Sequence, residues 1–135
     1  EAQKKEGGSI KNDISIPIKD ISKFIRSAIK ISKEVIPGSR CVVFGHIGDG
    51  NIHFNISQPV KADKDKFLKK ERALRKEIIN LTLDLKGSIS AEHGIGLTRK
   101  ADLKKYMKKD VEVFKSIKKS FDPNNIMNPG KVIDI

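Results

Sequence analysis

The spacing of hydrophobic residues changes along the first half of the chain between strand-like alternation and helical periodicity. Each change predicts the start of a new secondary-structure element. Residues 11–17 alternate polar and apolar up to Pro17, which predicts a short extended strand. From residue 18 to residue 36 the apolar positions recur at helical spacing, and Pro37 and Gly38 follow at once. This stretch is typical of an amphipathic helix that ends at the proline and glycine.

A second alternating stretch spans residues 41–57 and is interrupted by Asp49 and Gly50. This dipeptide is typical of a two-residue type I′ turn, so the stretch predicts a β-hairpin. Helical spacing returns from Asp63 to Lys86, and Ser88 to Ser90 reads as a short strand. The order strand, helix, hairpin, helix, strand is that of a ferredoxin-like βαββαβ fold, an α+β antiparallel sheet with helices on one face.

The two ends of the chain are predicted to form a loop, two short helices and an irregular segment. Residues 1–10 contain adjacent glycines and are interpreted as a loop or as the edge of a fragment, so that residues 11–135 form the domain. Thr98 is expected to cap a short helix that runs to Tyr106, and Asp110 to cap a second one. The segment from residue 121 to residue 131 contains two proline turns and is expected to be irregular.

The predicted turn sets the register of the hairpin and places two histidines together. With Asp49 and Gly50 as the loop, His46 faces His53 directly, and their Cβ atoms should lie about 4.5–5.5 Å apart. Alternation assigns one face to the core and the other to polar chemistry. The expected core face holds Val43, Ile47, Ile52, Phe54 and Ile56, and the other face holds Phe44, His46, His53, Asn55 and Ser57.

The remaining histidine, His93, follows Glu92 in a loop bounded by glycine after the predicted last strand. Two histidines and a glutamate, here His46, His53 and Glu92, are the ligand set of an open catalytic zinc site. Solvated histidines and a helix N-terminal carboxylate are the structural alternatives. In a regular ferredoxin-like sheet Glu92 reaches the histidines only if the last strand is short and its loop turns back.

Composition limits the classes of function. The chain has 135 residues and a net charge of +11 at pH 7, with 28 Lys and Arg against 17 Asp and Glu. The excess is mostly lysine spread over helix faces without interleaved aromatic residues, so a solvated surface that attracts small anions is favoured over nucleic-acid binding. The single cysteine, Cys41, excludes an internal disulfide. No apolar run suggests a transmembrane segment or signal peptide, and a cytoplasmic location, peripheral to the membrane through partners if at all, is expected.

Three segments carry a family resemblance: GHIGDGNIHFNI, SAEHGIG and FDPNNIMNPGKV. In this order they resemble the C-terminal portion of the FAD-linked 2-hydroxy-acid dehydrogenases, which include glycolate oxidase subunits, D-lactate dehydrogenase and D-2-hydroxyglutarate dehydrogenase. The resemblance implies the substrate or cap domain of a flavoenzyme of the vanillyl-alcohol-oxidase superfamily. An FAD-binding domain, in the same chain or in a split partner, would hold most of the cofactor.

The resemblance also implies roles for individual residues. It makes His46, His53 and Glu92 ligands of a divalent metal, zinc first, and His93 the base beside the substrate hydroxyl. The remaining assignments are substrate contacts for Lys11, Asn55 and His93, and cofactor contacts for Asn51, Asn128 and Lys131.

The function implied is oxidation of a small anionic 2-hydroxy acid to the 2-oxo acid, with hydride transfer to FAD. The chain alone is expected neither to turn over substrate nor to hold FAD tightly. Two other classes stay open: a basic ferredoxin-like module that binds RNA or protein, and a zinc hydrolase that uses Glu92 or His93 as base. The hydroxy acid, the metal, the electron acceptor and a homodimeric state are not decided by the sequence.

Overall fold

The structure is a computed structural model that describes residues 7–135 and divides into two compact units, residues 1–93 and residues 94–135. A loop was predicted over residues 1–10, and residues 1–6 of it lie outside the described part. The prediction was wrong at its C-terminal end, because Ser9 and Ile10 already belong to the first strand.

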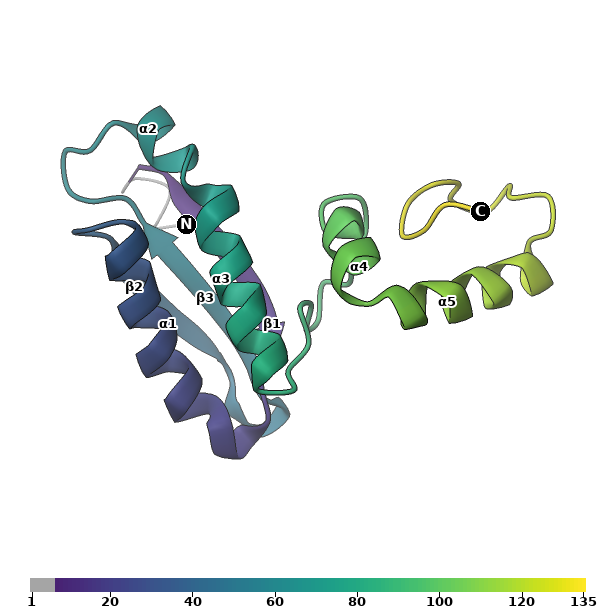
Figure 1. Ribbon diagram of the computed structural model, residues 1–135, viewed down its shortest axis with the longest axis horizontal. Coiled ribbons are helices and arrows are strands. Elements are labelled where there is room, and N and C mark those ends of the chain that lie inside the picture. The colour runs from purple at the N-terminus through teal and green to yellow at the C-terminus, as the bar shows by residue number, and fades with distance from the viewer. Residues whose placement is uncertain (1–6) are drawn as a thin grey trace. The chain divides into compact units, whose positions relative to one another are not determined.

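The first unit is an antiparallel sheet of three strands, in the order β1-β3-β2, with helices packed against one face (Figure 1). Contacts between α1 and α3, and between α3 and β1, hold this layer together. Its elements are β1 (Ser9–Ser15), η2 (Ile18–Asp20), α1 (Ile21–Val35), β2 (Arg40–His46), η3 (Ile47–Asp49), β3 (Asn51–Ser57), α2 (Lys64–Leu68) and α3 (Glu71–Asp84). The predicted α+β class is therefore confirmed.

The predicted fourth strand is reduced to a single bridge between Ser88 and Ser15, so the complete ferredoxin-like pattern is not formed. The two residues exchange both backbone hydrogen bonds, at 3.0 and 2.9 Å. The Ser88 hydroxyl then donates to the carbonyl of Ser90 at 2.8 Å. Local bonds of this kind compete with a strand ladder and turn the chain away after one residue.

The single long helix predicted from Asp63 to Lys86 is two helices, α2 and α3. Asp63 caps α2, since its carboxylate accepts a hydrogen bond from the Lys66 amide at 2.8 Å. At the other end the Lys70 amide bonds the Phe67 carbonyl, three residues back, at 3.0 Å. This tighter turn ends α2 before α3 begins.

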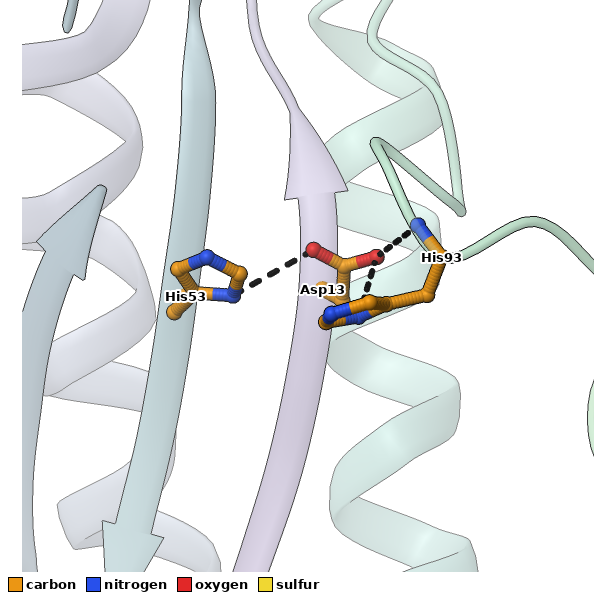
Figure 2. Close-up of side chains that lie close together, drawn as sticks. All are labelled: Asp13, His53 and His93. Carbon is orange, nitrogen blue, oxygen red and sulfur yellow. Dashed lines mark hydrogen bonds and ion pairs between the residues drawn. The ribbon is translucent and has the colours of Figure 1, made fainter. Parts of the chain in front are cut away.

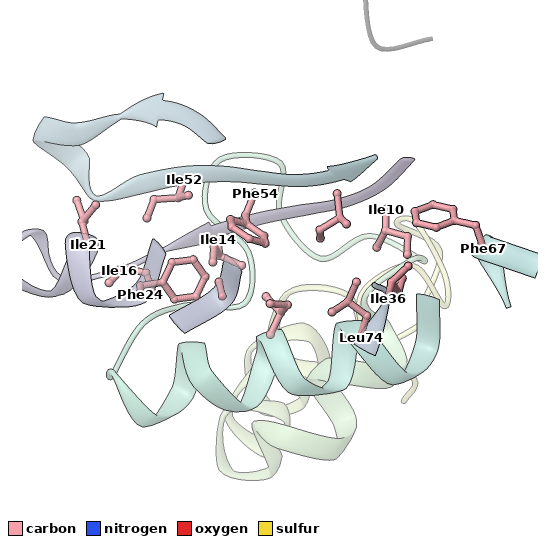
Figure 3. Close-up of a cluster of buried hydrophobic side chains, with 13 residues drawn as sticks. Ile10, Ile14, Ile16, Ile21, Phe24, Ile36, Ile52, Phe54, Phe67 and Leu74 are labelled. Carbon is pink, nitrogen blue, oxygen red and sulfur yellow. The ribbon is translucent and has the colours of Figure 1, made fainter. Parts of the chain in front are cut away.

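The core lies between the sheet and the helices (Figure 3). Ile14 of β1 and Phe54 of β3 point from the sheet toward Phe24 of α1, and all three side chains are fully buried. The rings of Phe24 and Phe54 pack edge to face with centroids 5.9 Å apart. Because strand residues alternate, burying one face leaves most polar residues of the strands on the other face, and Asn12 is the buried exception in β1.

The second unit contains α4 (Lys100–Tyr106), α5 (Lys108–Phe121) and the irregular tail that the sequence predicts. Neither predicted cap was correct, because Arg99 precedes α4 and Asp110 lies within the first turn of α5. The tail is anchored by Asp122, whose carboxylate accepts hydrogen bonds from the amides of Ile126 and Met127, both at 2.9 Å. Within residues 7–135, no helix combines the length and apolar character needed to cross a membrane.

Candidate functional site

The face of the sheet opposite the helices, here called the open face, carries most of the polar side chains of the three strands. Strand pairing arranges these residues in rows that cross the sheet from β1 through β3 to β2. Three of the rows are Lys11, Asn55 and Val42; Asp13, His53 and Phe44; and Ser15, Asn51 and His46.

The predicted direct pairing of His46 with His53 was wrong. His53 stands opposite Phe44, and His46 opposite Asn51. The reason is the turn, which contains the 3-10 segment Ile47–Asp49 followed by Gly50 at a φ of 70° instead of a two-residue loop. His46 and His53 are therefore diagonal neighbours on one face, a relation that typically separates Cβ atoms by about 7–8 Å.

The longer turn also moves Ile47, which was expected in the core. Its side chain is 72% exposed. The other four residues predicted for the core face, Val43, Ile52, Phe54 and Ile56, do pack in or against the core. The predicted separation of an apolar and a polar face is thus confirmed outside the turn.

Glu92 reaches both predicted metal ligands from the loop after the Ser88 bridge. Its Oε1 lies 3.0 Å from Nε2 of His53, and its Oε2 lies 3.8 Å from Nδ1 of His46. Nε2 of His93 lies 3.8 Å from the same Oε1. The last strand is thus short and its loop turns back over the open face. Both features were predicted from the sequence to be necessary for Glu92 to reach the histidines.

Asp13 is the site residue that the sequence analysis missed. Its Oδ1 lies 3.3 Å from Nδ1 of His53, and its Oδ2 lies 3.0 Å from Nδ1 of His93 (Figure 2). The His93 amide also donates to Oδ2, at 3.3 Å. Within residues 7–135 these three side chains form one group with the spacing of metal ligands. Alternation along β1 already placed Asp13 opposite the core face, but only the pairing with β3 shows that it faces His53.

The site has a sheltered part and an accessible part. The side chains of Asp13 and His53 are 13% and 14% exposed, whereas those of Glu92 and His93 are 44% and 67% exposed. A hollow of about 280 Å³ lies beside Glu92, and it is lined by Ser15, Asp49, Asn51, Ala91 and Glu92. Its volume is close to the lower end of the range for small-molecule sites, about 300 Å³.

The two predicted carboxylate contacts are direct neighbours. Lys11 of β1 faces Asn55 of β3, in the row next to Asp13 and His53. Lys11 is exposed and Asn55 is 6% exposed. Residues two apart on a strand lie about 7 Å apart, so this pair borders the histidine group.

The three predicted cofactor contacts belong to different units, Asn51 to the first and Asn128 and Lys131 to the second. Asn51 is buried, and its Nδ2 lies 3.4 Å from Nδ1 of His46. Among the described residues, its Oδ1 has no hydrogen-bond partner. Asn128 and Lys131 are exposed in the tail of the second unit, where the Lys131 amide donates to the Asn128 carbonyl at 3.3 Å. The flavin contacts therefore stay a prediction.

Cys41 does not belong to the site. It lies on β2 and packs against the core cluster. Burial raises the pKa of its thiol, so the reactive thiolate is disfavoured. The chemistry of the open face therefore depends on imidazole, carboxylate and ammonium groups.

Comparison with known proteins decides the family. Residues 1–132 match the family of FAD linked oxidases, C-terminal domain. The chain belongs to this family. The predicted resemblance is thereby confirmed, and it extends over almost the whole chain.

Relatives of this FAD-linked oxidase domain include three dehydrogenases or oxidases of hydroxy acids. A D-2-hydroxyglutarate dehydrogenase of Stutzerimonas stutzeri is 43% identical, over 90% of this chain and 26% of the relative. A D-lactate dehydrogenase of Archaeoglobus fulgidus is 34% identical, again over 90% and 26%. The glycolate oxidase subunit GlcD of Bacillus subtilis is 34% identical over 92% and 26%. The chain thus spans about a quarter of the length of these relatives.

Proposed function

We propose that this chain is the substrate-binding part of an enzyme that oxidises a small 2-hydroxy acid to the 2-oxo acid. The observation that carries the proposal is the convergence of the histidine and Glu92 group with Lys11 and Asn55 on one open face. FAD, when bound, supplies the acceptor for the hydride of the α-carbon. A separate FAD-binding part, in the same protein or in a partner, would hold most of it, with Asn51, Asn128 and Lys131 as candidate contacts from this chain.

We infer that the donors on the open face hold a divalent metal, and zinc is the first candidate. His46, His53 and Glu92 would hold it, because two imidazoles and one carboxylate leave a coordination position open for substrate. The Glu92 carboxylate lies between the two rings, and it is accessible from the hollow that Ser15 and Asn51 also line. A bound divalent ion lowers the pKa of an attached hydroxyl, which eases loss of its proton.

His93 is the base of the proposed reaction. Its Nδ1 faces Asp13, at 3.0 Å, while its side chain is 67% exposed. A proton held on Nδ1 leaves the lone pair of Nε2 free to accept the substrate hydroxyl proton. His93 also lies in the same loop as Glu92, so a substrate oxygen held near the carboxylate is within reach of the ring.

Lys11 and Asn55 bind the substrate carboxylate in this proposal. The exposed ammonium of Lys11 supplies charge, and the buried Asn55 is fixed in direction by its place in the central strand. The net charge of +11 adds a field that attracts anions to the face. Both contacts lie on the side of His53 away from the turn, which would orient the hydroxyl toward Glu92 and His93.

The metal part is tested by elemental analysis of the purified chain after dialysis against a weak chelator. We expect one zinc per wild-type chain, and loss of zinc in His46→Ala and His53→Ala. His93→Ala is the matched control, because it removes an imidazole from the same face without removing a proposed ligand, and it should keep zinc. A wild-type chain without metal, or a control that loses it equally, would contradict the ligand assignment.

The substrate part is tested by calorimetric titration of the zinc-loaded chain with glycolate, D-lactate and D-2-hydroxyglutarate. We expect one of these acids to bind, and Lys11→Ala to weaken its binding at least about tenfold, as loss of a charged hydrogen bond does. Lys23→Ala removes another exposed charge, from α1 on the helical side of the sheet, and should leave the affinity unchanged. Equal affinity in both variants would overturn the role of Lys11.

A further inference from the structure

We propose that Asp13 is a positioning residue that holds His53 and His93 through separate carboxylate oxygens and so directs the Nε2 atom of each ring outward. This inference rests on the proposed function for what the two Nε2 atoms do, but the contacts on Asp13 are independent of it. Asp13 thereby connects the metal ligand to the base of the proposed reaction.

The contacts divide cleanly between the two oxygens of the carboxylate (Figure 2). Oδ1 faces Nδ1 of His53 at 3.3 Å, and Oδ2 faces Nδ1 of His93 at 3.0 Å. The amide of His93 donates to Oδ2 as well, at 3.3 Å, so the backbone and the ring of His93 share one anchor. A carboxylate against Nδ1 of a histidine fixes both the orientation of the ring and the proton on Nδ1.

The unused hydrogen-bond capacity of Asp13 supports this arrangement. Its Oδ1 is buried and, in the part of the chain that the structure describes, makes no hydrogen bond. An unpaired carboxylate oxygen in a sheltered position is unfavourable. Nδ1 of His53 lies 3.3 Å from this oxygen, and a protonated Nδ1 turned toward it would give the oxygen a partner and leave the lone pair of Nε2 on the side of Glu92.

Direct metal ligation by Asp13, together with His53 and His93, is the competing arrangement, since the spacing of the three groups also suits it. Accessibility favours the positioning role. The carboxyl of Asp13 is 13% exposed, whereas Glu92 is 44% exposed and borders the hollow. A substrate can reach a metal on the Glu92 side of His53, while the sheltered carboxylate of Asp13 lies between the rings of His53 and His93.

The first experiment reads the position of the ring proton of His93 without any metal. Long-range ¹H–¹⁵N spectra of the metal-free chain, recorded where the imidazole is neutral, distinguish the Nδ1–H form from the Nε2–H form. We expect His93 to carry its proton on Nδ1 in the wild type and to change to the Nε2–H form in Asp13→Ala. An unchanged proton position in Asp13→Ala would overturn the proposal for His93.

The second experiment measures zinc affinity by chelator competition in Asp13→Asn, which keeps the size of the side chain. We expect the dissociation constant for zinc to rise about 10–100-fold with one zinc still bound, the usual effect of losing an outer partner of a ligating histidine. Asp65→Asn, the same change at an exposed position of α2, should match the wild type. An unchanged affinity in Asp13→Asn would overturn the proposal for His53.

Loss of zinc from Asp13→Asn as complete as from His53→Ala would also overturn the positioning role, because it would make Asp13 a ligand. A wild-type chain that binds no zinc would contradict the metal part of the proposed function. The proton position of His93 would then still decide whether Asp13 anchors that ring. The two failures are therefore distinguishable.

Discussion

Oε1 of Glu92 lies 3.0 Å from Nε2 of His53, so the loop after α3 is joined to the central strand of the sheet at the middle of the open face. No other carboxylate is proposed as a ligand, and Glu92 reaches the face only because the chain leaves the sheet after the single bridge at Ser88. The histidines alone therefore do not define the proposed metal site.

Replacing Glu92 by Gln should weaken zinc binding more than about 100-fold, because it removes the charge of a proposed ligand while keeping the size of the side chain. This loss exceeds the effect of about 10–100-fold expected for a residue that only hydrogen-bonds a ligating histidine. The measurement is chelator competition on the purified chain. Glu34→Gln changes an exposed carboxylate of α1 that lies 4.0 Å from Lys30, and it serves as the matched control. Equal zinc affinities in both variants would remove Glu92 from the site.

Replacing Gly45 by Ala should destabilise the sheet where His46 leaves β2. Gly45 has a φ of 153°, and a Cβ atom there would lie 2.2 Å from the carbonyl oxygen of Asn51. A residue forced into a sparsely populated conformation costs of order 1–3 kcal/mol, and this contact adds to it. Gly48→Ala is the control, because its Cβ would meet nothing within 4 Å. Urea unfolding should separate the variants, and equal midpoints would contradict the β2–β3 register.

The two faces of the sheet predict a large loss of stability for one phenylalanine variant and a small loss for another. Phe54 is fully buried against Phe24, so Phe54→Ala should lower the free energy of unfolding by about 3–5 kcal/mol. Phe44 is 54% exposed on the open face, so Phe44→Ala should cost much less. Denaturant unfolding of both variants is the measurement. A larger loss in Phe44→Ala would show that the open face is covered in solution.

Acid should release the tail of the second unit. The hydrogen bond from Lys118 lowers the pKa of the Asp122 carboxyl below its ordinary value, and the amides of Ile126 and Met127 act in the same direction. Because the folded pKa is the lower one, the stabilisation is complete above the unfolded value of about 3.9 and disappears as the pH falls through the folded value.

Hydrogen exchange at the amides of Ile126 and Met127 is the local readout of that effect. Their protection should fall at acid pH in the wild type, and it should already be low at neutral pH in Asp122→Asn. Asp110→Asn changes an exposed carboxyl in the first turn of α5 and should keep the protection. Protection that survives in Asp122→Asn would show that other contacts hold the tail.

The elements of the first unit were largely predictable, because hydrophobic periodicity and the proline and glycine residues that end an element are local signals. Helical spacing that stops before Pro37 predicted α1, and alternation predicted β2 and β3. The errors lie where local signals are ambiguous. Asp49 and Gly50 favour a two-residue turn, but the chain forms η3 first, which shifts the register and separates His46 from direct pairing with His53.

The sequence predicted part of the convergence on the open face, but not the contacts that connect its residues. Both histidines of the hairpin and Glu92 followed from the motifs, and the structure brings them within reach of one another. Asp13 could not be assigned from β1 alone, because a lone aspartate in an alternating strand is usually a solvated residue. The position of Asp13 opposite His53 depends on the pairing of β1 with β3, a non-local contact that no short motif encodes.

The bridge between Ser15 and Ser88 gives the two halves of the site unequal resistance to opening. His53 sits in a strand paired on both sides, so displacing its backbone requires the sheet to come apart. Glu92 and His93 follow a bridge of two backbone hydrogen bonds, and their segment can detach while β3 stays paired. We therefore expect assembly of the proposed site to depend on a local folding equilibrium of residues 88–93, to which a molecule bound between loop and sheet would contribute its binding energy.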